Sequence, residues 1–241
     1  MSAMPMPVLD VRTIYTVASV PIRVLGSGPT FFFEAGMAVD ADGSPHAYHP
    51  EKGKGLDNLG NAGHAGNWYG VVTDTGKANG TPIVQGPKDP APGFYVSPTA
   101  LQNRHLARTD PRRYVDSATI PYISLPGHSE VLKARLGDVA MVINGHNGRK
   151  SAAIYADVGP RKKIGEGSIA LAHALGLNES ARNGGTGHKI IVYIVFPHSG
   201  NGSPMELAAI QSTAKRLFDV WGGMRQVASL FPEFPNLKTI P

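Results

Sequence analysis

One stretch of the chain, residues 151–176, constrains the fold more than any other because it encodes a strand, a sharp turn and a helix in succession. Residues 151–155 are short and apolar, as in a strand, and Gly159-Pro160 stops the run. Ser168 is a favourable N-cap residue, and the apolar run of residues 169–175 that follows it ends at a glycine. The segment therefore predicts a strand and a helix that meet across a rigid turn.

Two carboxylates flank this turn. Asp157 stands at the end of the predicted strand, and Glu166, nine positions later, stands just before the predicted helix. Two carboxyl groups on rigid elements can face one cavity, and such a pair is the minimum apparatus for glycoside hydrolysis, in which one group protonates the leaving oxygen and the other activates water or attacks the sugar. A purely structural reading is that Asp157 caps a turn and Glu166 complements the helix dipole. Spacing alone leaves both readings open.

The rest of the sequence favours a β-rich fold in one domain. The 29 Gly and 20 Pro are spread among short apolar runs, which favours strands and loops over a helical bundle. One sizeable core suffices for a chain of this length, so residues 1–241 are expected to form a single domain. Long Gly- and Pro-rich loops at residues 53–66 and 79–93 are expected to wall a cleft or to cover the surface. Strands are expected near residues 13–17, 22–25, 30–33, 70–73, 122–125, 139–144, 152–157 and 189–196. This strand count, with the strand-turn-helix at Asp157, predicts a β-rich α+β fold: a small closed β-barrel with a few helices packed outside.

A second helix is expected near the C-terminus, at about residues 203–222. Ser203, with Glu206 three positions later, has the pattern of a capping box, and Gly222-Gly223 would end the helix. The apolar residues between them recur at helical spacing, which indicates a face that packs on the core: Leu207, Ile210, Ala214, Leu217, Phe218 and Trp221.

The run Ala-Asp-Val-Gly-Pro at residues 156–160, together with residues 163–172, resembles the signature of the fungal-type chitosanases, glycoside hydrolase family 75. Further blocks agree with that family in the same order: residues 37 and 39–43, 47–50, 114–116, 120–123 and 125–127, 136–140 and 193–197. Together the blocks cover about residues 30–200. The resemblance implies that Asp157 and Glu166 are the catalytic pair, with Glu166 as the general acid and Asp157 as the general base. It also implies inverting hydrolysis of β-1,4-linked amino sugars.

Two positions and the overall charge point to another polymer. The family pattern has an acidic residue where this chain has Ala38, and often a cysteine where it has Ala41. The formal net charge is +5, and such a field repels the polycation chitosan but suits an anionic glycan such as peptidoglycan. The turn at Asp157 is also similar to the catalytic aspartate turn of double-psi β-barrel enzymes, which include peptidoglycan lytic transglycosylases.

The predicted activity is therefore chitosanase-like first, with a cell-wall muramidase or lytic transglycosylase as the alternative. A third reading, from a different class, is a non-catalytic glycan-binding module. The presence of both Asp157 and Glu166 disfavours it, because a binding module needs neither carboxylate.

Four further residues are expected to bind the substrate. Asp40 and Asp42, just before Gly43, form an acidic turn whose carboxylates can hydrogen-bond sugar hydroxyls or a glucosamine ammonium; an EF-hand is disfavoured because it needs its glycine at the sixth position. Tyr48 lies beside a loop, where aromatic rings commonly stack on sugar faces. Lys163 lies in a basic run between the two carboxylates. The nine histidines lack the spacing of a zinc site, so no metal and no other cofactor is expected.

The chain has no cysteine, which excludes disulfides, thiolate metal sites and a cysteine nucleophile. Its N-terminal segment lacks a basic stretch followed by an apolar core, so no secretory signal peptide is visible. We nevertheless expect export, to the extracellular space or to the periplasm of a target cell, with folding in the cytoplasm also open. The predicted partners are the polysaccharide and, for an antibacterial effector, a secretion machinery or an immunity protein. No nucleic-acid-binding motif is found, and no apolar run is long enough to span a membrane.

Overall fold

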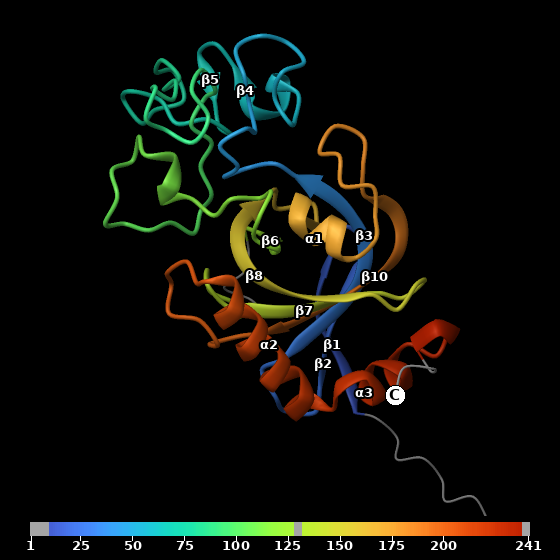
Figure 1. The fold of residues 1–241 in the computed structure, drawn as a ribbon. Coiled ribbons are helices and arrows are strands. Elements are labelled where there is room, and N and C mark those ends of the chain that lie inside the picture. Colours follow the sequence, from blue (N-terminus) through green and yellow to red (C-terminus); the bar gives the residue numbers. More distant parts are fainter. Residues whose placement is uncertain (1–9, 128–131, 238–241) are drawn as a thin grey trace, which may run out of the picture.

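Six strands close into a β-barrel (Figure 1). In a computed structural model of the chain, which describes residues 10–127 and 132–237, eight strands form one mixed sheet in the order β1-β2-β3-β10-β7-β8-β6-β9. A further pairing of β3 with β9 closes the six strands from β3 to β9 in this order into the barrel. Two of the barrel's pairs, β3–β9 and β6–β8, are parallel. The strands are β1 (Val11–Val17), β2 (Val20–Leu25), β3 (Phe31–Asp40), β6 (Tyr122–Pro126), β7 (Val139–Asn144), β8 (Lys150–Gly159), β9 (Glu166–Ser168) and β10 (Thr186–Phe196). The predicted β-rich α+β fold with a small closed barrel in one domain is confirmed.

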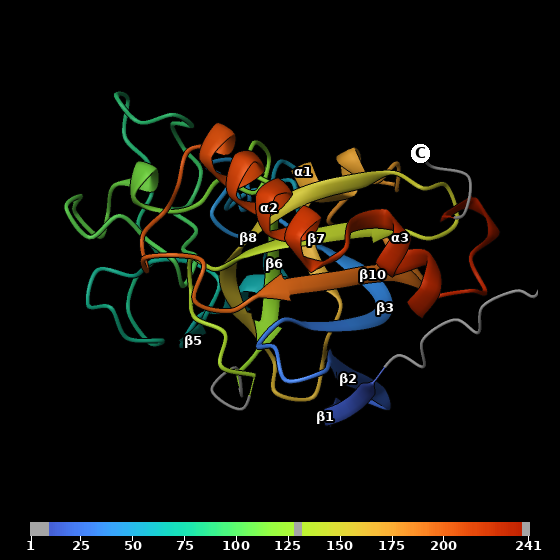
Figure 2. The same ribbon diagram turned by 90° about the horizontal axis from the view of Figure 1, so that it is seen from below.

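Alternate residues of the barrel strands supply two hydrophobic cores. On β3, Phe31 and Phe33 point into the barrel and Phe32 points outward; on β10, Tyr193 and Ile194 divide in the same way. This follows from the strand period of two. The helix α1 (Ile169–Ala174) adds the side chains of Leu171 and Ala172 to the inner core. The outer core is covered by α2 (Leu207–Trp221) and α3 (Gly223–Leu230), which lie across the outside of the barrel in Figure 2. Both faces of β10 are therefore buried along residues 191–196, as the continuous apolar run there indicates.

A lobe of loops stands on one end of the barrel, between β3 and β6 (Figure 1). Its regular elements are short: η1 (Leu59–Ala62), β4 (Gly63–His64), β5 (Asn67–Trp68) and η2 (Pro111–Arg113). The expected strand at residues 70–73 is wrong, because only Thr73 forms a bridge, to Pro82. Gly70 lies so close to Ala62 that a Cβ atom on it would be 2.8 Å from the Ala62 Cα atom, and the chain bends there instead of extending.

The predicted N-cap of α1 is confirmed. The Ser168 hydroxyl accepts hydrogen bonds from the backbone N–H of Leu171, at 3.1 Å, and from that of Tyr122 on β6, at 2.9 Å. Gly176, at φ +69°, follows the helix in a conformation that favours glycine. Ser168 thus ties the helix to the barrel directly beside Glu166.

Replacing Ser168 with Ala should lower the free energy of unfolding by about 2–4 kcal/mol. The change removes a helix cap and leaves the buried N–H of Tyr122 without an acceptor. Urea denaturation of both proteins measures the difference. Ser212→Ala, at an exposed position on α2, should change the free energy by less than about 0.5 kcal/mol. Equal losses in the two variants would contradict the assigned role of Ser168.

The C-terminal helix differs from its prediction at its start. It begins at Leu207 instead of Ser203, and no capping box forms, because Glu206 is the N-cap residue and its side chain makes no capping hydrogen bond. The backbone N–H of Ser203 instead donates to the side chain of Asn201. Five of the six residues of the predicted apolar stripe, all except Leu207, pack on the outer core, and Gly222, at φ +120°, ends α2 as expected. The short helix α3 that follows was not predicted. In the part of the chain that the structure describes, no helix is both long and apolar enough to cross a membrane.

Candidate active site

A cavity of about 930 Å³ opens where the loop lobe meets the barrel. Five carboxylates from separate parts of the chain line it: Asp40, Asp42, Asp57, Asp157 and Glu166. Two cationic side chains, Lys163 and Arg182, are also among its lining residues. All six residues predicted to be catalytic or substrate-binding therefore meet at one cavity.

Asp157 on β8 and Glu166 on β9 are held on either side of β6. Both pair in register with the same residue, Ser124, which sets their Cα atoms about 9.6 Å apart, since neighbouring strands lie about 4.8 Å apart. The Oε2 atom of Glu166 lies 3.0 Å from the position that a Cβ atom on Gly159 would take. Gly159 lies two residues after Asp157 on the same strand, a step of about 6.6 Å. The Glu166 carboxylate therefore lies beside Gly159, on the strand that carries Asp157.

Burial and neighbouring charges raise the proton affinity of Asp157 and Asp40. Burial raises the pKa of Asp157 to about 6, with a further contribution from the charge of Glu166 and an opposing one from the backbone N–H of Ala100, which donates to the carboxylate at 2.8 Å. Burial also raises the pKa of Asp40 to about 7, and the charges of Asp157 and Glu166 add to this effect. Each aspartate keeps a small part of its surface open to the cavity. At neutral pH Asp40 is therefore protonated in a large share of the molecules, whereas Asp157 is mostly charged and takes up its proton near pH 6.

Tyr48 and Ser97 position Asp42. The Tyr48 hydroxyl donates to Oδ1 of Asp42 at 2.8 Å, and the Ser97 hydroxyl donates to the same atom at 3.1 Å. Burial, with the charges of Asp40 and Asp157, raises the pKa of Asp42 well above its ordinary value. The Tyr48 side chain is only 2% exposed, so its ring offers no open face to a sugar. Its contribution to the site is to orient a carboxylate.

Three of the carboxylates form a cluster that suits a cation. Oxygen atoms of Asp40, Asp42 and Asp157 all lie within 4.8 Å of one another. Carboxylates at this spacing repel one another unless a proton or a cation lies between them. A metal ion that prefers oxygen ligands, or the ammonium group of an amino sugar, fits the chemistry of this cluster.

Lys163 and Arg182 stand on the rim of the cavity. The Lys163 Nζ atom lies 3.0 Å from Oε1 of Glu166, and 47% of the lysine side chain is exposed. Such an exposed ion pair contributes little free energy, so a substrate can displace the lysine at small cost. The Arg182 guanidinium donates to the backbone carbonyls of Gly53 and Gly55, which joins the loop before β10 to the lobe.

Sequence reasoning missed two residues that build the site. Ser124 lies between the paired carboxylates, and its hydroxyl lies 3.4 Å from Oδ2 of Asp40. A single polar residue in the otherwise apolar run of β6 was the available signal. Gly159 was interpreted as a turn residue, whereas its missing side chain also leaves space for the Glu166 carboxylate. That contact joins separate strands and has no local signature.

The wild-type protein should lose stability as the pH rises from about 4 to about 7. The pKa values of Asp40 and Asp157, about 7 and 6, exceed the ordinary value of 3.8, so the folded state binds these protons more tightly than the unfolded state. The stabilisation is complete below pH 3.8 and is lost as the pH rises through the folded-state values, an effect on the order of 3–4 kcal/mol for each aspartate.

Chemical denaturation at several pH values measures this slope. Asp40→Asn should flatten it, because a neutral side chain replaces the group with the higher of the two pKa values. Asp219→Asn, at an exposed position on α2, is the matched control and should leave the slope unchanged. A wild-type stability that is constant or rises over this range would contradict the prediction.

Residues 97–221 match the sequence profile described as fungal chitosanase of glycosyl hydrolase group 75. The match covers more than half of the 241 residues. The chain belongs to glycosyl hydrolase group 75. The family predicted from the motif is thereby confirmed, and membership makes the protein a chitosanase-like glycoside hydrolase. Asp157, Lys163 and Glu166 lie in the matched segment, whereas Asp40 and the lobe before residue 97 lie outside it. Among curated proteins, none matches the chain.

Proposed function

We propose that the protein hydrolyses a β-1,4-linked polymer of amino sugars that carry free amino groups. The observation that carries this proposal is the cavity in which five carboxylates outnumber two cationic side chains. The net charge of +5 would repel such a polycation at long range. Inside a cleft the nearest charges dominate, because Coulomb energies fall with distance and with the polarity of the medium. The cavity therefore attracts ammonium groups although the whole chain is cationic.

The catalytic pair in this proposal is Asp157 and Glu166. Glu166 donates its proton to the glycosidic oxygen as the bond from that oxygen to the anomeric carbon breaks. Asp157 takes a proton from a water molecule, whose oxygen attacks the anomeric carbon from the opposite face. We propose the inverting route, which needs the two carboxyl groups about 6.5–9.5 Å apart, over a retaining one, which needs about 5–5.5 Å. Before donation the Lys163 ammonium must leave Glu166, because an ion pair favours the charged carboxylate.

Asp40 and Asp42 are proposed to receive the ammonium group of a glucosamine unit. A cation between these carboxylates removes their mutual repulsion with Asp157. It also lowers the proton affinity of Asp157, which keeps that residue charged, as a base must be, down to lower pH when the substrate is bound. Substrate binding thus prepares the base for the reaction.

A second candidate function is cleavage of peptidoglycan, as a muramidase or a lytic transglycosylase. The net charge and the rim cations Lys163 and Arg182 favour an anionic glycan. Export to the extracellular space or to a target periplasm remains part of either proposal, because both polymers lie outside the cytoplasm. Fractionation of expressing cells tests export, because an exported protein appears in the medium or in the periplasmic fraction.

Incubation with chitosan, chitin oligomers and purified peptidoglycan, followed by mass analysis of the products, separates the candidates. We expect chitosan fragments with free reducing ends of inverted anomeric configuration. Anhydro ends on peptidoglycan fragments would establish the transglycosylase instead, and no product from any polymer would favour a binding module. A parallel reaction with a chelator distinguishes an ammonium group from a metal ion in the aspartate cluster. If the cation is the ammonium group of the substrate, the chelator should leave the activity unchanged.

A further inference from the structure

A second hollow of about 280 Å³ lies in the lobe next to the carboxylate cavity. The two share three lining residues, Tyr69, Pro98 and Thr99, so they adjoin along one wall. Most of the other lining residues of the second hollow precede residue 97 and lie outside the segment that matches the family. A polymer bound at the carboxylates can therefore extend into a site that this chain builds from its own lobe.

An aromatic platform stands at this junction. Tyr69 is 65% exposed, and the adjacent Trp68 is half-buried, with its ring centroid 6.3 Å from that of Tyr95. The backbone N–H of Trp68 donates to the carbonyl of Ala78 at 2.7 Å, and Trp68 pairs with Gly63 across β4 and β5. The platform is thus held by the lobe before any ligand binds. Rigid aromatic faces of this kind bind sugar rings with little loss of conformational entropy.

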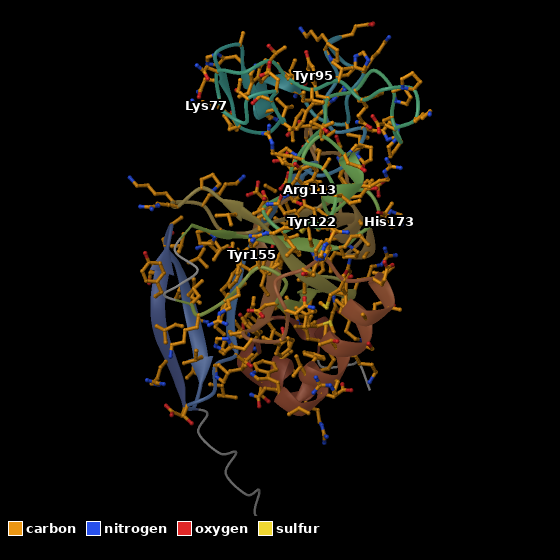
Figure 3. All side chains as sticks on the ribbon, turned by 90° about the vertical axis from the view of Figure 1, so that its left-hand side faces the viewer. Lys77, Tyr95, Arg113, Tyr122, Tyr155 and His173 are labelled. Atoms are coloured by element: carbon orange, nitrogen blue, oxygen red, sulfur yellow. The ribbon has the colours of Figure 1, made fainter. Side chains whose placement is uncertain are left out.

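The charge of the second hollow is opposite to that of the first. Lys77 and Arg108 line it, and none of its described lining residues is acidic. The Arg108 Nη2 atom donates to the backbone carbonyls of Thr73, at 3.0 Å, and Asp74, at 3.2 Å. These contacts keep the guanidinium in place, whereas Lys77, at the outer edge of the lobe in Figure 3, forms no ion pair with any residue that the structure describes. An ammonium group in this hollow would meet two like charges and no carboxylate.

We propose that the second hollow is a subsite for an N-acetylated sugar, so that the protein selects partly acetylated chains. A glucosamine unit lies at the carboxylates and an acetylated unit stacks on Tyr69 and Trp68. The acetamido group is neutral and therefore avoids the repulsion that Lys77 and Arg108 impose on an ammonium group. This pattern of selection rests on the proposed function, whereas binding of the acetylated sugar to the hollow can be measured without any cleavage.

Trp68 can report on the hollow directly. The chain has two tryptophans, and the second, Trp221, packs on Phe32 in the outer core. The Trp221 indole N–H has no hydrogen-bond partner among the described residues, so Trp221→Phe removes no hydrogen bond and leaves Trp68 as the only tryptophan. We expect N-acetylglucosamine tetramers to change the Trp68 fluorescence with a dissociation constant at least tenfold lower than that of glucosamine tetramers. If the variant does not fold, the same change is followed in the wild-type protein, where Trp221, packed in the outer core, gives a constant background.

Two variants and one control test the assigned contacts. Tyr69→Ala should raise the dissociation constant of the acetylated tetramer at least tenfold. Lys77→Glu should reduce the difference between the dissociation constants of the acetylated and the glucosamine tetramers. Lys88→Glu makes the same charge change at an exposed lysine of the lobe that lines neither hollow, and it should leave both constants unchanged. Equal or tighter binding of the glucosamine tetramer, or no response to either tetramer, would overturn the proposal. Tighter binding of a muramic acid fragment than of the acetylated tetramer would overturn it in favour of an anion subsite.

Product analysis completes the test. On partly acetylated chitosan the fragments should carry an N-acetylated unit at one fixed distance from the cut, and Tyr69→Ala should lose this enrichment. Random acetylation around the cut would refute the selection. If no polymer is cleaved while Trp68 still responds to the acetylated tetramer, the proposed catalytic function fails and the subsite stands.

Discussion

Glu166→Gln and Asp157→Asn should each lower kcat on the cleaved glycan by at least about 1000-fold, while the free energy of unfolding and glycan binding stay close to the wild type. Each change keeps the shape of the side chain and removes either the proton donor or the proton acceptor of the reaction. Initial rates measured on one defined oligomer give the loss. Asp116→Asn, at a lobe position that lines neither hollow, is the control and should keep full activity.

Chemical rescue then separates the two roles. A substrate whose leaving group needs no protonation should restore the rate of Glu166→Gln but not that of Asp157→Asn. Added azide, which needs no general base, should restore the rate of Asp157→Asn but not that of Glu166→Gln. If the rescues exchange, Asp157 is the acid and Glu166 the base. Near-wild-type activity in either variant would remove that residue from the mechanism, and loss in Asp157→Asn alone would favour a transglycosylase with a single catalytic acid.

Gly159→Ala should lower kcat about 10- to 100-fold with little change in KM or in stability. The added Cβ atom would lie 3.0 Å from Oε2 of Glu166, so the carboxylate has to move away from its position opposite Asp157. A displacement of about 1 Å in a reacting group can cost about 100-fold in rate. Steady-state kinetics measures the loss, and thermal denaturation checks that the fold is kept.

Gly127→Ala is the matched control for Gly159→Ala. Gly127 follows β6, whose last residue pairs with Gly159, but a Cβ atom on Gly127 would meet its nearest neighbour, in the Arg161 side chain, at an ordinary 3.5 Å. This variant should keep wild-type kcat. Equal kinetics for the two variants, both like the wild type, would show that the position of the Glu166 carboxylate does not depend on Gly159.

Local patterns were sufficient for the elements that carry the catalytic pair. The strand before Asp157, the turn and the Ser168-capped helix have their signals within residues 151–176, and all are found. The prediction of a capping box at Ser203 was wrong, because the side chain of Asn201 accepts a hydrogen bond from the Ser203 N–H and the helix starts later. The prediction of a strand at residues 70–73 was wrong, because the close contact of Gly70 with Ala62 bends the chain. Both failures involve competing contacts that propensity does not include.

The sequence by itself determined the chemistry available to this protein: two carboxylates around one turn, an acidic turn at Asp40 and Asp42, and a family signature. Only the tertiary structure decided that these groups act on one another, because Asp40 and Asp157 are 117 positions apart in the chain and meet through the closure of the barrel. The distribution of charge also depends on which residues the fold brings together. The sum of +5 follows from composition, whereas the field at a site depends on distance and burial, which composition does not contain. Folding places five carboxylates around one cavity and two cations around the next, and that placement is the basis for the proposed substrate.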